Sequence, residues 1–468
     1  SFDSAGLKGQ RIERSAPAII FGALTMPPLQ PTRPLRRFVA LAVAAALGDG
    51  WASEAAPRRV AVHKLRFSTQ PKEADSGERR FFEADGPERE LLFRGVNVVY
   101  KDPPWIPHTA GFQSNLSFVE DDVLLLKSLG VNLVRLGVMW PGLVPARGQV
   151  SVEYAQGIRR IIAMCAQHGI YTLLEPHQDE LNPVFCGEGA PDWWVHEQAL
   201  STATFPVPVQ DTPFSQSPPT YDMCHKHVSF SYIWTKDSAV GYQRLYETSA
   251  SPDGRSKLGP FGEYWAAVAE LFGGAPGVLG GEIWNEPFPG DVFGDPRYRG
   301  NAYADEHNLQ PWYTNLTAAI RSRSGDMLVA YEPSWPVGTQ DIRPDERLPT
   351  TSGFRASSGQ PSIFEDQIYA FHWYSPPCAG DLSPYLDGRV EDARRLKAAP
   401  LATEYNFHAV DAATEARMRD HIVRFEQARV SYTGWQYKSY SGSLPEGTCT
   451  GCGNSFFGPD GSLWQPMA

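Results

Sequence analysis

The chain has 468 residues, of which 42% are hydrophobic, 20% charged and 12% aromatic. This length fits one α/β barrel with insertions as well as roughly two or three average domains. The formal net charge of −11 argues against a nucleic-acid partner, because phosphate binding requires clustered Lys and Arg with a basic balance.

The N-terminal region has the layout of a secretory signal. Beginning at Met26, three arginines precede the apolar stretch Phe38–Leu47 and a small-residue site that ends at Ala55. A charged, an apolar and a cleavable part in this order is typical of a signal peptide, and ten apolar residues are too few to span a bilayer. We therefore expect residues 1–55 to comprise an upstream segment and a signal peptide from about Met26 to Ala55, and the mature protein to be secreted.

Beyond this region, short apolar runs alternate with longer helical patterns, as in βα units around a parallel sheet. Eight runs are the predicted strands: 91–98, 132–137, 171–176, 278–285, 327–332, 369–374, 401–405 and 432–437. No GxGxxG motif follows the first of them, as a doubly wound dinucleotide-binding sheet would require. The sequence thus predicts a (β/α)8 barrel over residues 56–445 and a short tail over 446–468.

Helical periodicity predicts the elements between these strands: 118–129, 153–168, 263–272, 306–323, 390–397 and 413–428. The first should open with a capping box, in which Ser117 is followed three residues later by Glu120. The second should end at Gly169, because glycine readily adopts the left-handed backbone that terminates a helix.

The connection after the third strand, residues 181–260, is far longer than a typical βα loop. Its place on the substrate-binding face favours a lid or wall of the site, and a disulfide-tied surface excursion is the alternative. Because secretion favours disulfides over metal ligands, we expect Cys186 and Cys224, which bracket this loop, to pair. Cys449 and Cys452 lack the second CxxC or His-rich segment of a zinc site, so no metal is expected.

Two glutamates lie where predicted strands end. Glu286 follows the fourth strand and Glu404 ends the seventh. Barrel enzymes hold their catalytic groups at strand carboxyl ends, and a retaining glycosidase needs two carboxylates about 5–5.5 Å apart. A single glutamate in such a place is more often a salt-bridged structural residue, but the pair favours catalysis.

The sequence resembles glycoside hydrolase family 5 through Asn285-Glu286-Pro287 and Thr403-Glu404. Within that family it is similar to the endoglycoceramidases, which cut the bond between an oligosaccharide and ceramide. The closer resemblance rests on four stretches: 94–101 (RGVNVVYK), 177–179 (HQD), 186–193 (CGEGAPDW) and 281–287 (GEIWNEP). Two features depart from that pattern, namely the long insertion after HQD and the 28 residues after Tyr440, too few for the β-sandwich that usually follows the barrel.

The resemblance implies that Glu286 is the general acid/base and Glu404 the nucleophile, with no cofactor. It also implies that Arg135 holds the nucleophile ionised and oriented, and that Asn285 bonds the sugar 2-OH. Further substrate contacts are implied for Lys101, His177, Asp179, Tyr374 and Trp435. Charged and amide groups suit sugar hydroxyls, and an aromatic ring suits the sugar face.

The implied partner is a glycosphingolipid or another β-glycoside, with transient contact to a membrane or micelle surface, and the protein is expected to be a monomer. Aromatic residues of the insertion could form an apolar surface for the lipid or could pack beneath the loop: Phe185, Trp193, Trp194 and Trp234. Two other functions stay open. One is a glycosidase for soluble β-glucans, β-glucosides, glucosylceramide or steryl glucosides, and the other a carbohydrate- or lipid-binding barrel without turnover.

Overall fold

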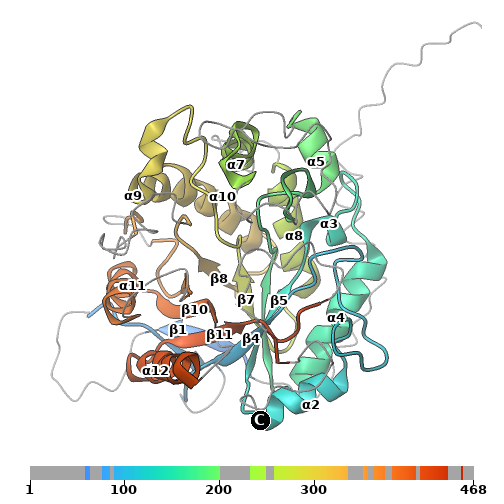
Figure 1. Ribbon diagram of the computed structural model, residues 1–468, viewed down its shortest axis with the longest axis vertical. Helices are drawn as coiled ribbons and strands as arrows, with labels where there is room; N and C mark the ends of the chain where they lie inside the picture. The colour runs from blue at the N-terminus through green and yellow to red at the C-terminus, as the bar shows by residue number, and fades with distance from the viewer. Residues whose placement is uncertain are drawn as a thin grey trace, which may run out of the picture.

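The computed structural model describes residues 58–63, 76–84, 89–200, 232–248, 258–335, 352–356, 362–374, 382–406, 412–440, 455 and 456. Eight parallel strands close into a barrel in the order β10-β11-β4-β5-β6-β7-β8-β9, with helices around it (Figure 1). Their bounds are β4 Arg94–Val98, β5 Leu133–Gly137, β6 Tyr171–Glu175, β7 Val278–Glu282, β8 Leu328–Tyr331, β9 Ile368–Trp373, β10 Ala399–Asn406 and β11 Ser431–Trp435. The predicted (β/α)8 barrel is confirmed, and each predicted strand overlaps one of these eight.

Strand register brings polar side chains together at one end of the barrel. β4 and β5 pair so that Asn97 lies opposite Arg135. β10 has a register irregularity between Ala402 and Glu404, beyond which Glu404 lies opposite His372 of β9. Irregularities of this kind at a barrel rim re-aim side chains, and here the affected residue is one of the two predicted catalytic glutamates.

The main helices overlap the predicted ones, and their bounds are α2 Glu120–Ser128, α4 Val152–Gln167, α8 Pro260–Phe272, α10 Gln310–Arg321, α11 Leu382–Leu396 and α12 Ala412–Gln427. Shorter helical elements lie in the loops: α3 Trp140–Leu143, η3 Pro296–Arg299, α9 Asn301–Ala304 and η4 Asp305–Leu309. The capping box predicted from Ser117 and Glu120 is wrong. The N-cap of α2 is Val119, whose backbone N–H donates to Asp122, and the Ser117 hydroxyl instead bonds the backbone of Gln113.

A small antiparallel sheet that the sequence did not predict closes the amino-terminal end of the barrel. It comprises β1 Val60–His63, β2 Arg80–Glu83 and β3 Glu90–Leu91. Phe81 of β2 packs against Phe93, at 5.1 Å between ring centroids, and joins an apolar cluster formed by the first residues of the barrel strands. This end is therefore packed with side chains, and the opposite end is left for the site.

The described part of the insertion contains η1 Pro183–Phe185, α5 Asp192–Glu197, η2 Tyr232–Trp234 and α7 Lys236–Thr248. Phe185 and Trp194 are fully buried, so both belong to the core and not to an apolar surface for a lipid. Cys186 is disulfide-bonded, whereas its predicted partner Cys224 lies outside the described residues.

Two residues of the predicted C-terminal tail lie against the barrel. Phe456 is buried, contacts the ring of Tyr437 at 5.4 Å between centroids and donates its backbone N–H to the Tyr437 carbonyl. Within the described ranges, none of the helices combines the length and the apolar character that crossing a bilayer requires.

Candidate active site

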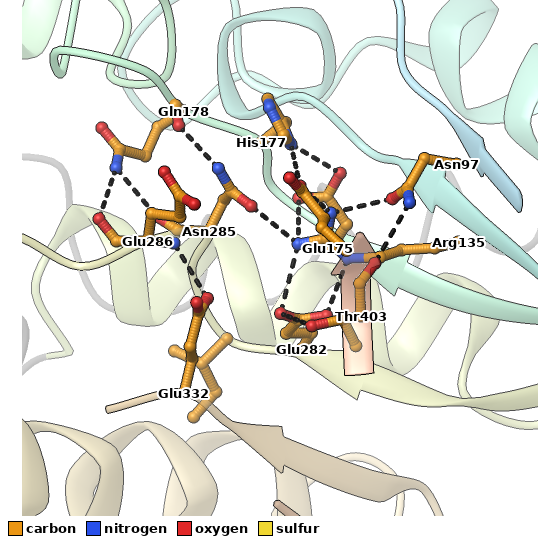
Figure 2. A network of polar contacts seen from close by, with 12 residues as sticks. Asn97, Arg135, Glu175, His177, Gln178, Glu282, Asn285, Glu286, Glu332 and Thr403 are labelled. Carbon is orange, nitrogen blue, oxygen red and sulfur yellow. Dashed lines mark hydrogen bonds and ion pairs between the residues drawn. The ribbon is translucent and has the colours of Figure 1, made fainter. Parts of the chain in front are cut away.

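The residues predicted to act on substrate lie in a barrel strand or in the loop at its carboxyl end, and the structure brings them together. Figure 2 shows Arg135, His177, Asn285 and Glu286 among them. Arg135 is their centre and is fully buried. Its Nη1 donates to Glu404 at 2.7 Å, its Nη2 donates to Asn285 at 2.8 Å, and its Nε donates to Glu282 at 2.8 Å. Burial disfavours the charge, but Glu175 and Glu282 outweigh it and raise the pKa of Arg135 well above its usual value. The guanidinium is thus a permanent cation beside Glu404.

Glu404 is held through both carboxylate oxygens. Arg135 donates to Oε1, and the hydroxyl of Tyr374 donates to Oε2 at 2.5 Å. Burial and the nearby Glu404 raise the pKa of Tyr374 well above its usual value, so Tyr374 keeps its proton and acts as a donor. Two hydrogen bonds of this kind hold a carboxylate in one orientation, as a nucleophile that attacks a single carbon atom requires.

The surroundings of Glu286 favour a protonated carboxyl group. Burial, followed by the negative charge of Asp179, raises the pKa of Glu286 to about 8, so its carboxyl group is protonated at neutral pH. Among the charged neighbours of Glu286, Asp179 makes the largest contribution. Burial also lowers the pKa of His372 to about 4, which leaves a neutral imidazole whose Nδ1 lies 2.8 Å from Oε1 of Glu286. If Nδ1 carries the imidazole proton, it donates to Oε1 and leaves Oε2 to hold the acidic proton.

The carboxyl groups of the two glutamates are closely spaced. An oxygen of Glu286 and an oxygen of Glu404 lie within 4.8 Å of each other. Retaining glycosidases place these groups about 5–5.5 Å apart, whereas inverting enzymes need about 6.5–9.5 Å to fit a water molecule. The arrangement therefore suits direct attack by Glu404 on the anomeric carbon.

A charged and aromatic wall adjoins Glu404. Lys101 forms ion pairs with Asp179 and with Glu188, the latter at 3.2 Å, and its ammonium group lies 4.8 Å from the centre of the Trp435 ring. His177 stacks on Trp435, at 4.7 Å between centroids. Charged groups of this kind suit sugar hydroxyls.

The protonation of His177 follows from its neighbours. Burial disfavours the charged imidazole, but Glu175, 3.2 Å from Nδ1, outweighs it and raises the pKa of His177 to about 10. The resulting imidazolium lies 4.0 Å from Oε1 of Glu404. His177 and Arg135 together thus place two positive charges beside the predicted nucleophile.

Three sets of side chains have potential metal-ligating atoms within 4.8 Å of one another: His177 with Asp179 and Glu188, Glu282 with Glu332 and His372, and Glu286 with His372 and Glu404. Each set already contains a carboxylate paired with Lys101 or Arg135. A metal ion would therefore meet an existing positive charge at each position, so the side chains fit a metal poorly.

Sequence reasoning did not assign a role to the residues that hold Asn285 and Glu286 in place. The Nε2 of Gln178 donates to the backbone carbonyls of Asn285, at 2.8 Å, and of Glu286, at 3.0 Å (Figure 2). The Oε1 of Gln178 accepts from the hydroxyl of Tyr242 at 2.6 Å. Gln178 is the middle residue of the HQD stretch, which was the available signal.

Two further residues were missed around Arg135. Asn97 accepts from Arg135 at 2.9 Å and donates to the backbone carbonyls of Thr403 and Gly434, so these bonds link four strands. Glu282 binds both Arg135 and the hydroxyl of Thr403. Both are polar residues buried in strands, a pattern that the sequence could have revealed.

Residues 109–441 match the family described as cellulase, glycosyl hydrolase family 5. An endoglycoceramidase of Hydra vulgaris is 35% identical over 362 residues, which cover 76% of this chain and 65% of that protein. A glucosylceramidase of Rhizopus delemar is 26% identical over 237 residues, covering 44% of this chain and 34% of that protein. The solved structure of endo-glycoceramidase II from Rhodococcus sp. with a cellobiose-like imidazole shares the fold, with a TM-score of 0.55, 19% identity and coverage of 77% and 76% of the two chains.

Proposed function

Since this chain belongs to the cellulase family, glycosyl hydrolase family 5, we propose that it is a retaining glycosidase that cleaves the β-glycosidic bond between glycan and ceramide. The observation that supports it best is the pair of carboxylates within 4.8 Å, with Glu286 protonated and Glu404 held by two donors. The lipid leaving group is proposed from the similarity to the Hydra endoglycoceramidase, of whose length the chain spans 65%.

The reaction has two steps. In the first, Glu404 attacks the anomeric carbon, the bond to the glycosidic oxygen breaks, and Glu286 gives its proton to that oxygen as ceramide leaves. In the second, Glu286, now ionised, takes a proton from water, and the hydroxide attacks the anomeric carbon and releases Glu404. Two displacements at the same carbon return its original configuration.

The surroundings of the two glutamates support an orientation for the substrate. Glu286 protonates the oxygen that leaves with the lipid, so the aglycone lies on its side. Lys101, Asp179 and His177 form the wall beside Glu404, and in this orientation they face the sugar. Asn285 fits a contact to the 2-OH, because Arg135 and Gln178 fix its side-chain amide.

A second candidate is cleavage of glucosylceramide, which the partial similarity to the Rhizopus glucosylceramidase favours. It uses the same chemistry and differs only in the number of sugars that the site accepts. Secretion is part of our proposal too: residues 26–55 have the signal layout, and the disulfide at Cys186 suits an oxidising compartment.

The decisive experiment incubates the protein with fluorescent lactosylceramide, fluorescent glucosylceramide and a soluble β-glucan, and identifies the products by mass spectrometry. Release of intact lactose with ceramide supports the proposal. Cleavage of glucosylceramide alone supports the second candidate, and cleavage of the soluble glucan alone overturns both. Glu404→Gln, purified in parallel, controls for a contaminating glycosidase.

A further inference from the structure

Glu332 is a buried carboxyl group directly behind Glu286 (Figure 2). It follows the last residue of β8, and its Oε2 accepts the backbone N–H of Glu286 at 2.9 Å. Glu286 has φ of +39°, a left-handed conformation that residues other than glycine adopt rarely. The contact therefore fixes the peptide group of a residue whose backbone is in an unusual state.

The peptide at Glu286 is held from both sides. Gln178, after β6, donates to the carbonyl of Asn285, which shares a peptide group with the N–H of Glu286, and to the carbonyl of Glu286 itself. Glu332, after β8, accepts the N–H of Glu286. β6 and β8 are the two strands that adjoin β7 in the barrel. Each neighbouring strand thus contributes one side chain that orients the predicted acid.

Burial and two acidic neighbours favour the uncharged form of Glu332, and Arg135 opposes them. The ionisable groups that face Glu332 are those of Glu282, Glu286, Arg135 and His372. Within the described part of the chain, its one ion-pair contact is to Nδ1 of His372, at 3.6 Å. Burial raises the pKa of Glu332 well above its usual value, and Glu282 and Glu286 add to the effect. An uncharged carboxyl still accepts the N–H through its carbonyl oxygen, and it does not repel Glu286 once that residue has lost its proton.

We propose that Glu332 is a positioning residue: its carboxyl group holds the backbone N–H of Glu286 and so aims the acid at the glycosidic oxygen. The inference rests on the proposed role of Glu286 as general acid/base. It predicts a loss that depends on the leaving group, because an activated leaving group needs little protonation whereas an alkyl alcohol needs the acid in place.

The test compares kcat/KM for methyl β-lactoside and 2,4-dinitrophenyl β-lactoside in two variants. Glu332→Gln keeps an uncharged acceptor of similar shape and should retain most of the activity on both substrates. Glu332→Leu removes the acceptor and should lose about 100-fold on the methyl lactoside, as displacement of a catalytic group by about 1 Å can cause. On the dinitrophenyl lactoside, the Leu variant should stay close to the unsubstituted protein.

Asp305→Ala provides a matched control. Asp305 is another buried carboxyl group, and it accepts the backbone N–H groups of Ser334 and Gly353, so it supports the same loop after β8. Loss of Asp305 should change kcat/KM for both lactosides by the same factor. Equal losses on both lactosides in Glu332→Leu, or no loss on either, would overturn the positioning role.

The Gln variant decides the matter if Glu332→Leu does not fold. If Glu332 is uncharged, kcat/KM of Glu332→Gln should still fall with rising pH near the pKa of Glu286, about 8. A fall that begins at lower pH would mean that the substitution removed a negative charge, which contradicts an uncharged Glu332. If the unsubstituted protein cleaves neither lactoside nor any glycolipid, the proposed function fails, whereas a failure confined to the variants concerns Glu332 alone.

Discussion

The hydroxyl of Tyr374 donates to Oε2 of Glu404 at 2.5 Å, on the oxygen that Arg135 does not bond. The two donors restrict rotation of the carboxylate and keep it directed at the anomeric carbon. Hydrogen bonds to charged groups contribute about 1.5–3 kcal/mol, so Tyr374→Phe should lower kcat/KM roughly 10- to 100-fold. Tyr385→Phe is the control: the hydroxyl of Tyr385 donates to a backbone carbonyl, that of His372, and its loss should have a small effect on kcat/KM.

Replacement of Glu404, the proposed nucleophile, should nearly abolish turnover. Glu404→Gln has similar size and can still accept from Arg135, but an amide cannot form the glycosyl ester. We expect a loss of about 10³-fold or more in kcat, with residual activity from binding and electrostatics. Initial rates on fluorescent lactosylceramide measure it, and near-normal turnover would contradict the assignment of Glu404.

Azide separates the roles of the two glutamates. In Glu286→Ala an activated aryl lactoside still forms the glycosyl-enzyme, and azide attacks it without base assistance, so added azide should restore turnover and yield a β-glycosyl azide. The product's configuration is read from its NMR coupling constants. The retained β-glycosyl azide from Glu404→Ala, together with the inverted α-glycosyl azide from Glu286→Ala, would mean that the two roles are exchanged.

The pH profile should reflect the protonation of Glu286. The general acid must carry its proton, and burial raises the pKa of Glu286 to about 8, so activity is retained through neutral pH and lost as the pH rises through about 8. We expect kcat/KM for methyl β-lactoside to fall about tenfold per pH unit above this value. The fall with rising pH should be smaller for the dinitrophenyl lactoside. A fall that begins below pH 6 would contradict a protonated Glu286 at neutral pH.

The disulfide at Cys186 should link the insertion to itself through Cys224. Digestion without reductant should yield a joined peptide pair that separates on reduction, detected by mass spectrometry. Removal of both cysteines should lower the free energy of unfolding by about 3–4 kcal/mol in the chain-entropy model. Linkage of Cys186 to Cys378, Cys449 or Cys452 would refute the pairing. Cys165 is not a candidate partner, because it is free and buried.

Local patterns were sufficient for the barrel and for the two glutamates. Parallel strands buried on both faces appear as continuous apolar runs, so all eight could be located without knowledge of their neighbours. Glu286 and Glu404 stood out because a charged side chain at the end of such a run would be costly without a role. The antiparallel sheet at the other end was missed because its strands are only two to four residues long.

Contacts between residues far apart in the chain determined the partners and the protonation of Glu286. The partners of Glu286 are Gln178, Glu332 and His372, which come from three other strands or the loops after them. Their distances depend on strand order and register, including the irregularity before Glu404, and a linear pattern specifies neither. Protonation followed from the same packing, because burial and opposing charges shift a pKa only once the groups have been brought together.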